Sequence, residues 1–295
     1  MRAPGIRALG VLTGNVEFAD GGSAGASSRG SADGGSAGAS SRGSADGGSA
    51  GAISGPPQMK ILTLARPDRP GDRFRRATRE CLLALAAVDA MLEDGKAPRE
   101  AIRGERTALL YVTAAAYGAS NREFIERRGG VTHFAYTAPA VVPAEVAIEF
   151  GVTGPYGILI GGAPATLRAI EQAARLLDSG TCDRALLLAV EIFEECADLY
   201  AGHRRFTRWP LVETAACLWL ERGEGELRFE SVRGGRSSGP AARGGERFAA
   251  GPLADLREWL DRAPAGPLEL SGRWRGERAR LRWSMLTSHP CGSTA

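Results

Sequence analysis

The chain has 295 residues, enough for one large domain or two small ones with a substantial buried core. Its formal net charge of +3 is too small to indicate a nucleic-acid partner. The basic residues are nearly all arginine, so Schiff-base chemistry would have to use Lys60 or Lys96. We find no signal-peptide pattern and no apolar run of about 18 residues, and we expect a cytoplasmic protein without a membrane span.

The cysteines and histidines indicate neither a disulfide framework nor a metal site. Five cysteines lack C-x-x-C spacing, and three scattered histidines form no ligand cluster. We therefore expect a reduced protein with no metal and no cofactor. The residues are Cys81, Cys182, Cys196, Cys217 and Cys291, and His133, His203 and His289.

The N-terminal region predicts a strand and turn over Gly5–Phe18, followed by a 13-residue repeat. The segment Ala19–Ser31 recurs at Ala32–Ser44, and Ala45–Ala52 begins a third copy. Because Gly, Ser and Ala offer little apolar surface to bury, the repeat predicts a disordered insert. The short chain before it favours a duplication tolerated in a surface loop over a tether between modules.

These features predict four segments. Residues 1–18 supply the first strand of a domain, and residues 19–57 form the low-complexity insert. Residues 58–232 continue the domain, and residues 233–295 are an Arg-rich C-terminal extension.

After the insert, strands and helices alternate along the chain. Alternation of this kind favours an α/β layered core with a largely buried sheet. Gly180 is placed to cap the second long helix. The predicted helices are Arg73–Leu92, Pro143–Phe150, Pro164–Asp178 and Leu253–Arg262. The predicted strands are Met59–Pro67, Thr107–Thr113, Tyr156–Ile160, Arg184–Ile192, Glu213–Leu220 and Glu226–Val232, with two edge strands near Leu268–Leu270 and Ala279–Met285.

The order of motifs resembles the N-terminal half of a beta-ketoacyl synthase, a condensing enzyme of the thiolase fold. A weaker likeness continues over Glu213–Val232. The resemblance implies a thiolase-like layered fold, present here as its N-terminal half only. The motifs are GIRALGVLTGNVEF (Gly5–Phe18), DRF (Asp72–Phe74), VVPAEVAIEFGVTGP (Val141–Pro155) and AIEQAARLLDSGTCDRALLLAVE (Ala169–Glu191).

The resemblance places Ala163 where active synthases carry a nucleophilic cysteine at the start of a helix. A thiolate there is stabilised by free N–H groups and the helix dipole, and alanine cannot replace it as an acyl acceptor. The family's two catalytic histidines and its downstream lysine belong to motifs that this chain lacks. Only His203 and His289 follow the helix, and neither lies in a comparable context. We therefore expect a chain that is catalytically inactive on its own.

This pattern resembles the chain-length factors, inactive subunits that pair with an active beta-ketoacyl synthase and help to bound its acyl tunnel. A half-length form accompanies the synthases of aryl polyene pathways. The resemblance implies a heterodimer in fatty-acid, polyketide or aryl polyene biosynthesis, visited by acyl carrier protein. It places Tyr156–Ile160 and His133–Val142 at the partner, with the interface residues His133, Phe134, Tyr156, Ile158 and Ile160. Chain-length factors commonly carry Gln at the nucleophile position, so Ala163 argues against residual decarboxylase activity.

A half-length domain is also expected to expose surface that the missing half would cover, which would make it unstable or prone to aggregation alone.

Two other functions stay open. The chain could be an acyl-thioester enzyme that uses Cys196 and His203, or a decayed remnant without function. Cys182 and Cys217 are predicted to be core residues, and the pair Glu194 and Glu195 is predicted to be a solvated helix start.

Two glycine- and arginine-rich features have simple structural explanations. The turn at Gly161 and Gly162 lacks the spacing of a phosphate-binding loop. The arginines of the tail could attract an acidic carrier protein or nucleic acid, but a solvated edge-strand face is the preferred interpretation. They are Arg273, Arg275, Arg278, Arg280 and Arg282.

Overall fold

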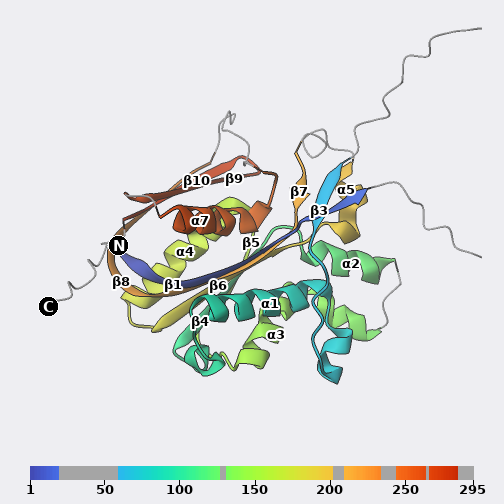
Figure 1. The fold of residues 1–295 in the computed structure, drawn as a ribbon, viewed down its shortest axis with the longest axis horizontal. Helices are drawn as coiled ribbons and strands as arrows, with labels where there is room; N and C mark the ends of the chain where they lie inside the picture. The colour runs from blue at the N-terminus through green and yellow to red at the C-terminus, as the bar shows by residue number, and fades with distance from the viewer. Residues whose placement is uncertain (20–58, 127–130, 202–208, 234–243, 264–265, 285–295) are drawn as a thin grey trace, which may run out of the picture.

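A seven-stranded mixed sheet forms the centre of the molecule (Figure 1). The computed structural model describes residues 1–19, 59–126, 131–201, 209–233, 244–263 and 266–284. The strand order is β5-β4-β6-β8-β10-β9, and β1 also pairs with β8. The strands are β1 (Arg2–Thr13), β4 (Thr107–Thr113), β5 (Tyr156–Ile160), β6 (Arg184–Glu191), β8 (Thr214–Arg233), β9 (Leu268–Trp274) and β10 (Glu277–Ser284).

The parallel strands β5, β4 and β6 confirm the strands predicted from continuous apolar runs. All seven residues of β4 are buried, as expected for a strand that is covered on both faces. Successive side chains therefore face different cores: Leu109 and Tyr111 pack with one layer of helices, and Leu110 and Val112 pack with the other.

Helices cover both faces of this sheet (Figure 1). On one face, α1 (Arg79–Asp94) and α3 (Val141–Phe150) bury their apolar sides, and the short α2 (Tyr117–Ile125) lies nearby. On the other face lie α4 (Ala163–Asp178) and α7 (Gly251–Arg262). Gly180 follows α4 with φ of 73°, which confirms its predicted role at the helix end. No helix of the described residues is long and apolar enough to cross a membrane.

A second, three-stranded sheet joins the two ends of the repeat insert. Its strand β2 (Val16–Ala19) pairs antiparallel with β3 (Lys60–Thr63), and β3 pairs with β7 (Leu211–Val212). The repeat itself, predicted to be a disordered insert, lies outside the described residues. The pairing of β2 with β3 places the insert between two adjacent strands of one domain.

Several predicted elements have different bounds. The helix predicted over Arg73–Leu92 is a 3-10 turn (Asp72–Arg76) and then α1, because Thr78 caps α1 by accepting a hydrogen bond from the Cys81 N–H. The strands predicted over Glu213–Leu220 and Glu226–Val232 are one strand, β8. Gly223 and Gly225, which lie between the two predicted strands, are extended within β8. A Cβ on Gly223 would lie 2.4 Å from the Gly5 nitrogen, so glycine here permits the close approach of β1.

Because β8 is long, its last part carries two further strands that pack over α4. The first part of β8 pairs with β1 and β6, and its last part, from Glu226 to Arg233, pairs with β10. Strands β10 and β9 then lie over α4 and α7 (Figure 1). Leu268, Leu270 and Leu281 are buried in the same core as α4. The expected exposed surface is therefore absent at α4, where the chain supplies its own cover.

A buried ion pair fixes the junction between the two sheets. Glu213 is fully buried and accepts two hydrogen bonds from Arg79, both at 2.7 Å. Burial alone would raise the pKa of Glu213, but the guanidinium holds it below its ordinary value. Arg79 also bonds Glu195 at 2.6 Å and lies 3.6 Å from Glu194. The pair predicted to be a solvated helix start therefore belongs to an ion-pair network.

A second acidic group, Glu80, is buried on α1 without such a partner. It is 1% exposed, and its Oε2 forms no hydrogen bond within the described residues. Burial, aided by the charge of Glu195, raises the pKa of Glu80 to about 8 despite the neighbouring Arg79. The folded protein therefore holds a neutral carboxyl at this position below about pH 8.

This protonation predicts a loss of stability as the pH rises. In the unfolded chain the Glu80 carboxyl ionises near pH 4.5. Between pH 4.5 and 8 the folded state therefore binds more protons than the unfolded state, and the free energy of unfolding falls as the pH rises. We expect Glu80→Gln to remove about 2–4 kcal/mol of this fall. Urea unfolding from pH 5 to 9 measures how the free energy of unfolding changes with pH. The variant Glu93→Gln, at an exposed position on the same helix, is the control. Parallel profiles for wild type and Glu80→Gln would contradict the assignment.

Candidate functional site

The turn between β5 and α4 lies at the position to which the resemblance assigns the family nucleophile. The Gly161 N–H donates to the Thr113 carbonyl at 2.9 Å and continues the parallel ladder to the end of β4. Ala163 is the first residue of α4, and Pro164 follows it, as is common in a first helical turn. The predicted strand, turn and helix are therefore present, and Ala163 brings a methyl group to the start of the helix.

Strand β9 lies directly against this turn. A Cβ on Gly272 would lie 2.5 Å from the Ala163 Cβ, closer than real Cβ contacts allow. A Cβ on Gly162 would lie 2.6 Å from the Trp274 ring. The contact thus needs glycine at 162 and 272, and it brings the backbone of β9 against the methyl group of residue 163. Both sides of this contact come from the same chain.

Aromatic side chains pack around the same end of α4. The Trp274 and Phe248 ring centroids are 4.8 Å apart, and those of Phe248 and Phe193 are 5.0 Å apart at 80°. Tyr200 packs edge-on to Phe193. Edge-to-face geometry is favourable between aromatic rings, so the cluster adds to the stability of the closed arrangement.

Glu191 connects this cluster to the end of β4. Its buried carboxyl group accepts N–H groups of Ala114 at 2.6 Å, Ala115 at 3.0 Å and Ala249 at 3.2 Å. Burial raises the pKa of Glu191 to about 8, and these N–H bonds oppose the shift. Ala249 is also held through its carbonyl, which accepts the Thr166 hydroxyl at 2.5 Å. The segment before α7 is therefore attached both to the sheet and to α4.

The arrangement holds no group that could take an acyl chain at the turn. Ala163, Gly162 and Gly272 carry no nucleophile or general base, and Trp274 has only an indole N–H donor. Within the described residues, no three His, Cys, Asp or Glu side chains are grouped as a metal would require. The turn serves as a packing surface for β9.

The alternative nucleophile, Cys196, is not placed for catalysis. It is 3% exposed, and burial raises the pKa of its thiol to about 11, which leaves little thiolate near neutral pH. His203, its proposed partner, lies outside the described residues. Cys182 and Cys217 are fully buried, as predicted for core residues.

The predicted interface residues lie on and around an open edge of the sheet. Among the described residues β5 pairs only with β4, and its ends are exposed, Tyr156 to 50% and Ile160 to 51%. Ile158 is half-buried and packs on the core below α3. Phe134, 63% exposed, lies in the 3-10 segment Val131–Thr137. His133 belongs to the same segment, but its side chain is outside the described part of the structure.

Sequence reasoning missed some of the residues that shape these surfaces. Ile148 on α3 and Ile125 on α2 are 66% and 75% exposed, apolar and on elements next to the predicted interface. Their exposure depends on helix orientation, which periodicity alone did not give. Gly272 was detectable, because a glycine inside a strand signals close approach of another backbone.

Comparisons with known proteins agree with this fold. No curated protein sequence matches the chain. Residues 68–205 match the model described as beta-ketoacyl synthase, N-terminal domain. The predicted resemblance to the beta-ketoacyl synthases is therefore confirmed over that segment.

Three solved structures have similar folds. The ketosynthase ApeO in complex with its chain length factor ApeC from Xenorhabdus doucetiae has a TM-score of 0.53 and 15% identity, over 74% of this chain and 83% of that chain. The ishigamide ketosynthase/chain length factor has a TM-score of 0.60 and 16% identity, over 79% and 89%. AntDE:AntF, a type II PKS acyl-carrier protein in complex with its ketosynthase, has a TM-score of 0.58 and 12% identity, over 78% and 90%. At these identities they confirm the thiolase-like fold.

The contact between β9 and the turn makes a testable prediction. Gly272→Ala places a methyl group against the Ala163 backbone, and we expect it to lower the free energy of unfolding by about 1–3 kcal/mol. Gly5→Ala is the matched control, since its nearest neighbour would be an ordinary 3.8 Å contact. Urea denaturation of both variants measures the difference, and equal stabilities would show that β9 does not press on the turn.

Proposed function

We propose that this chain is a catalytically inactive, beta-ketoacyl-synthase-like subunit of chain-length-factor type. It pairs with an active beta-ketoacyl synthase in fatty-acid, polyketide or aryl polyene biosynthesis. The partner supplies the cysteine and histidines, and acyl carrier protein visits the complex. The observation that carries the proposal is the β5–α4 turn, where Ala163 lies against Gly272 of β9 and Gly162 lies against the Trp274 ring.

The missing thiol and the contact with β9 both support inactivity. Ala163 lines a cavity of about 800 Å³ between α7 and β9, but it presents only a methyl group there, and the backbone of β9 at Gly272 lies against it. Acyl transfer needs both a nucleophile and space for the substrate beside it. The arrangement therefore suits a subunit that has kept the strand and helix as structure.

The open edge at β5 supports pairing. A strand edge with unpaired backbone groups and exposed apolar side chains is a surface that another strand can cover. Tyr156, Ile160, Phe134 and Ile148 supply apolar area on and around that edge. Two of the similar structures are described as ketosynthases with chain length factors, and one as a ketosynthase with an acyl-carrier protein. These descriptions supply the partner classes that we propose for this chain.

The pairing predicts a loss of association when the edge is charged. We expect the tagged chain to recover a full-length ketosynthase from native cells in near-equal amount. The double variant Tyr156→Asp/Ile160→Asp should reduce that recovery at least tenfold, because buried aromatic and aliphatic anchors dominate interface energies. Quantitative mass spectrometry of the co-purified chains makes the measurement.

Val232→Asp is the matched control, because Val232 is 56% exposed on β8, on the far side of β4 and β6 from the β5 edge. Circular dichroism establishes that each variant is folded. Recovery of a stable lone chain in the wild type, or a complex unaffected by the β5 variant, would contradict the proposal. Turnover of acyl thioesters by the lone chain would support the enzyme alternative instead.

A further inference from the structure

The ribbon formed by β8, β10 and β9 has an open edge at β9. The sequence predicted that the arginines of the tail lie on an edge strand, but β10, which carries three of them, pairs with β8 on one side and β9 on the other. Strand β9 pairs with β10 alone among the described strands. On its other side, Glu269, Leu270 and Ser271 form no backbone hydrogen bond within the described residues. This edge therefore offers N–H and C=O groups to another strand.

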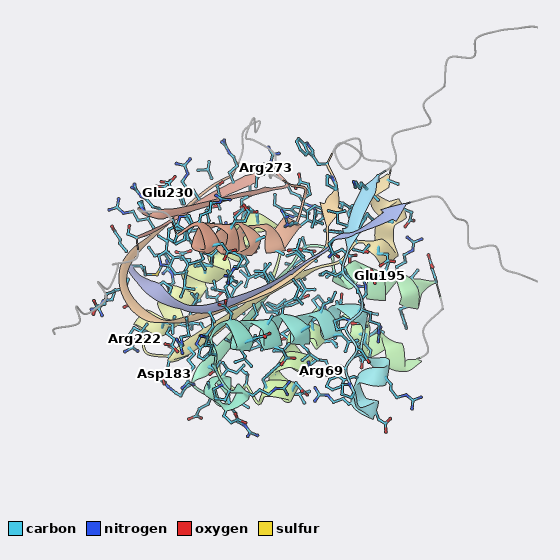
Figure 2. The ribbon with its side chains drawn as sticks, viewed as in Figure 1. Arg69, Asp183, Glu195, Arg222, Glu230 and Arg273 are labelled. Atoms are coloured by element: carbon cyan, nitrogen blue, oxygen red, sulfur yellow. The ribbon has the colours of Figure 1, made fainter. Side chains whose placement is uncertain are left out.

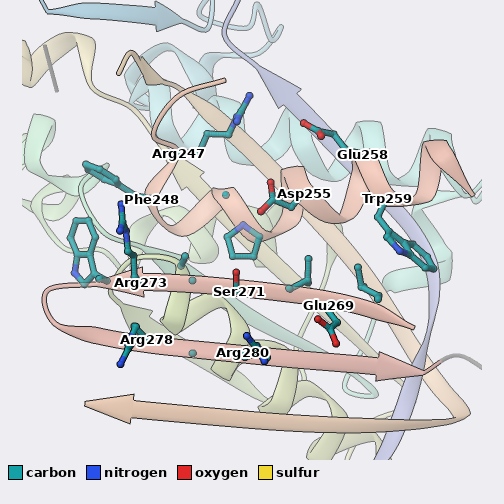
Figure 3. A pocket seen from close by; sticks show the side chains of 18 of the residues that line it. Arg247, Phe248, Asp255, Glu258, Trp259, Glu269, Ser271, Arg273, Arg278 and Arg280 are labelled. Atoms are coloured by element: carbon teal, nitrogen blue, oxygen red, sulfur yellow. The ribbon is translucent and has the colours of Figure 1, made fainter. Parts of the chain in front are cut away.

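The open edge of β9 borders a groove. Figure 2 shows Arg273 of β9 at the ribbon and Arg69 on the opposite side of the molecule, beside the α1 layer. Helix α7 runs along the open edge, on the side of β9 away from β10 (Figure 3). A cavity of about 800 Å³ lies between this helix and the strand. The edge of β9 is therefore one wall of the groove, and α7 is the other.

The groove has the dimensions of a single extended strand. The seven residues of β9 span about 20 Å, and the twelve residues of α7 span about 18 Å. A volume of about 800 Å³ along that length corresponds to a cross-section of about 45 Å². One added strand occupies about 4.8 Å within a sheet and about 10 Å across it. The groove therefore has room for one further strand beside β9.

The lining of the groove matches the alternation of a strand. The inner part is apolar and includes Leu270 of β9, Pro252 of α7 and Ala163 of α4. The rim is polar, and Ser271 of β9 and Asp255 of α7 are both exposed there. Because successive side chains of a strand point to opposite faces, an added strand would place alternate residues in the inner part and at the rim. The groove therefore suits a segment in which apolar and polar residues alternate.

The charges along the rim differ from one end to the other. On β9, Arg273 lies near one end of the groove and Glu269 near the other. Glu269 lies 3.8 Å from Arg282, and both side chains are more than half exposed. Asp255 lies on the wall that faces Ser271 (Figure 3), and it forms no ion pair within the described part of the chain. The middle of the groove and the end at Glu269 therefore favour cationic side chains.

We propose that the groove between β9 and α7 binds an extended segment of a partner protein as an added antiparallel strand. The segment carries lysine or arginine opposite Glu269 and opposite Ser271, where it meets Asp255, with apolar residues between them. An acidic residue lies opposite Arg273, which has a contact within the chain but carries five N–H donors. Opposite charges in directly opposed positions stabilise a pair of strands, and main-chain hydrogen bonds supply affinity. Strands β9 and β5 are at opposite ends of the sheet, so this inference does not rest on the proposed function.

A second copy of this chain is the main competitor for the edge. The rim residues of β9 are self-complementary, because antiparallel pairing centred on Ser271 would place Glu269 of each copy opposite Arg273 of the other. However, α7 lies along the same edge (Figure 3), so two paired β9 strands would bring two α7 helices into the same space. A single extended segment carries no such helix. The geometry therefore favours a segment of a partner over a second copy.

The test uses the full chain and a fluorescein-labelled peptide, STELKVKTS, whose central residues have the proposed pattern. Fluorescence anisotropy should show saturable binding. The control peptide STKLEVKTS has the same composition and net charge, but it places glutamate opposite Ser271, beside Asp255, in either strand direction. It should bind at least fivefold more weakly, because like charges in opposed positions destabilise the pair. Equal affinities of the two peptides would overturn the proposed charge pattern.

Methylation of the peptide backbone separates strand addition from other modes of binding. Only every second residue of a strand bonds to a given neighbouring strand, so only alternate N–H groups of the peptide can donate to β9. One version is methylated at the leucine and valine amides, and another at the glutamate and central lysine amides. One of them should lose at least tenfold in affinity while the other stays within about threefold. Equal effects of the two would overturn strand addition, and this comparison uses the wild-type chain.

A charge reversal on α7 locates the peptide in the groove. Asp255→Lys should weaken binding of STELKVKTS at least tenfold, because it places a cation beside the central lysine. Glu93→Lys makes the same charge change at an exposed position of α1, and it should leave binding within about twofold. Both variants should keep the wild-type melting temperature. Equal effects of the two substitutions would overturn the site, and a dimer that the peptide dissociates in sedimentation would assign the groove to a second copy.

Discussion

The fold depends on covering α4 from two sides. One side of this helix packs on the central sheet through residues such as Leu167 and Ile170, and both residues are fully buried. The helix would expose apolar surface if its other side met water, and burial contributes about 25 cal/mol for each Å² of that surface. The long β8 prevents this exposure, because it continues past the central sheet and forms a ribbon with β10 and β9 that covers the second side of α4. The Trp283 indole N–H, which donates to the Pro4 carbonyl at 3.1 Å, joins that ribbon back to β1.

The same cover determines what the start of α4 can do. Close packing requires small residues where a strand crosses a helix end, and Gly162, Ala163 and Gly272 meet that requirement. The methyl group of Ala163 faces the backbone of β9 in this contact, and Ala163 also lines the cavity of about 800 Å³ between α7 and β9. The contact therefore adds packing at the start of α4, and residue 163 brings no thiol, hydroxyl or imidazole to it.

The sequence predicted the parts of this structure that local pattern determines. Strands β4 and β5 have the bounds that their apolar runs indicated, although only β4 is buried on both faces. The prediction was wrong at two places. The single helix predicted around Thr78 is divided there, because Thr78 caps α1. The two strands predicted on either side of Gly223 are one continuous strand, β8. The closed turn was beyond such reasoning, since Ala163 and Gly272 are far apart in the chain and meet only through the bend of β8.

The two ends of the sheet differ in the kind of association they can support. At β5 the exposed side chains are apolar and the backbone edge is open, so partner binding there would bury surface and depend little on salt. At the ribbon the exposed side chains carry both signs of charge: Arg280 of β10 lies opposite Glu230 of β8, and Arg282 lies 3.8 Å from Glu269 of β9. Interactions of these side chains would be screened by salt. The two surfaces lie apart in the sheet, because β4, β6 and β8 lie between β5 and β10.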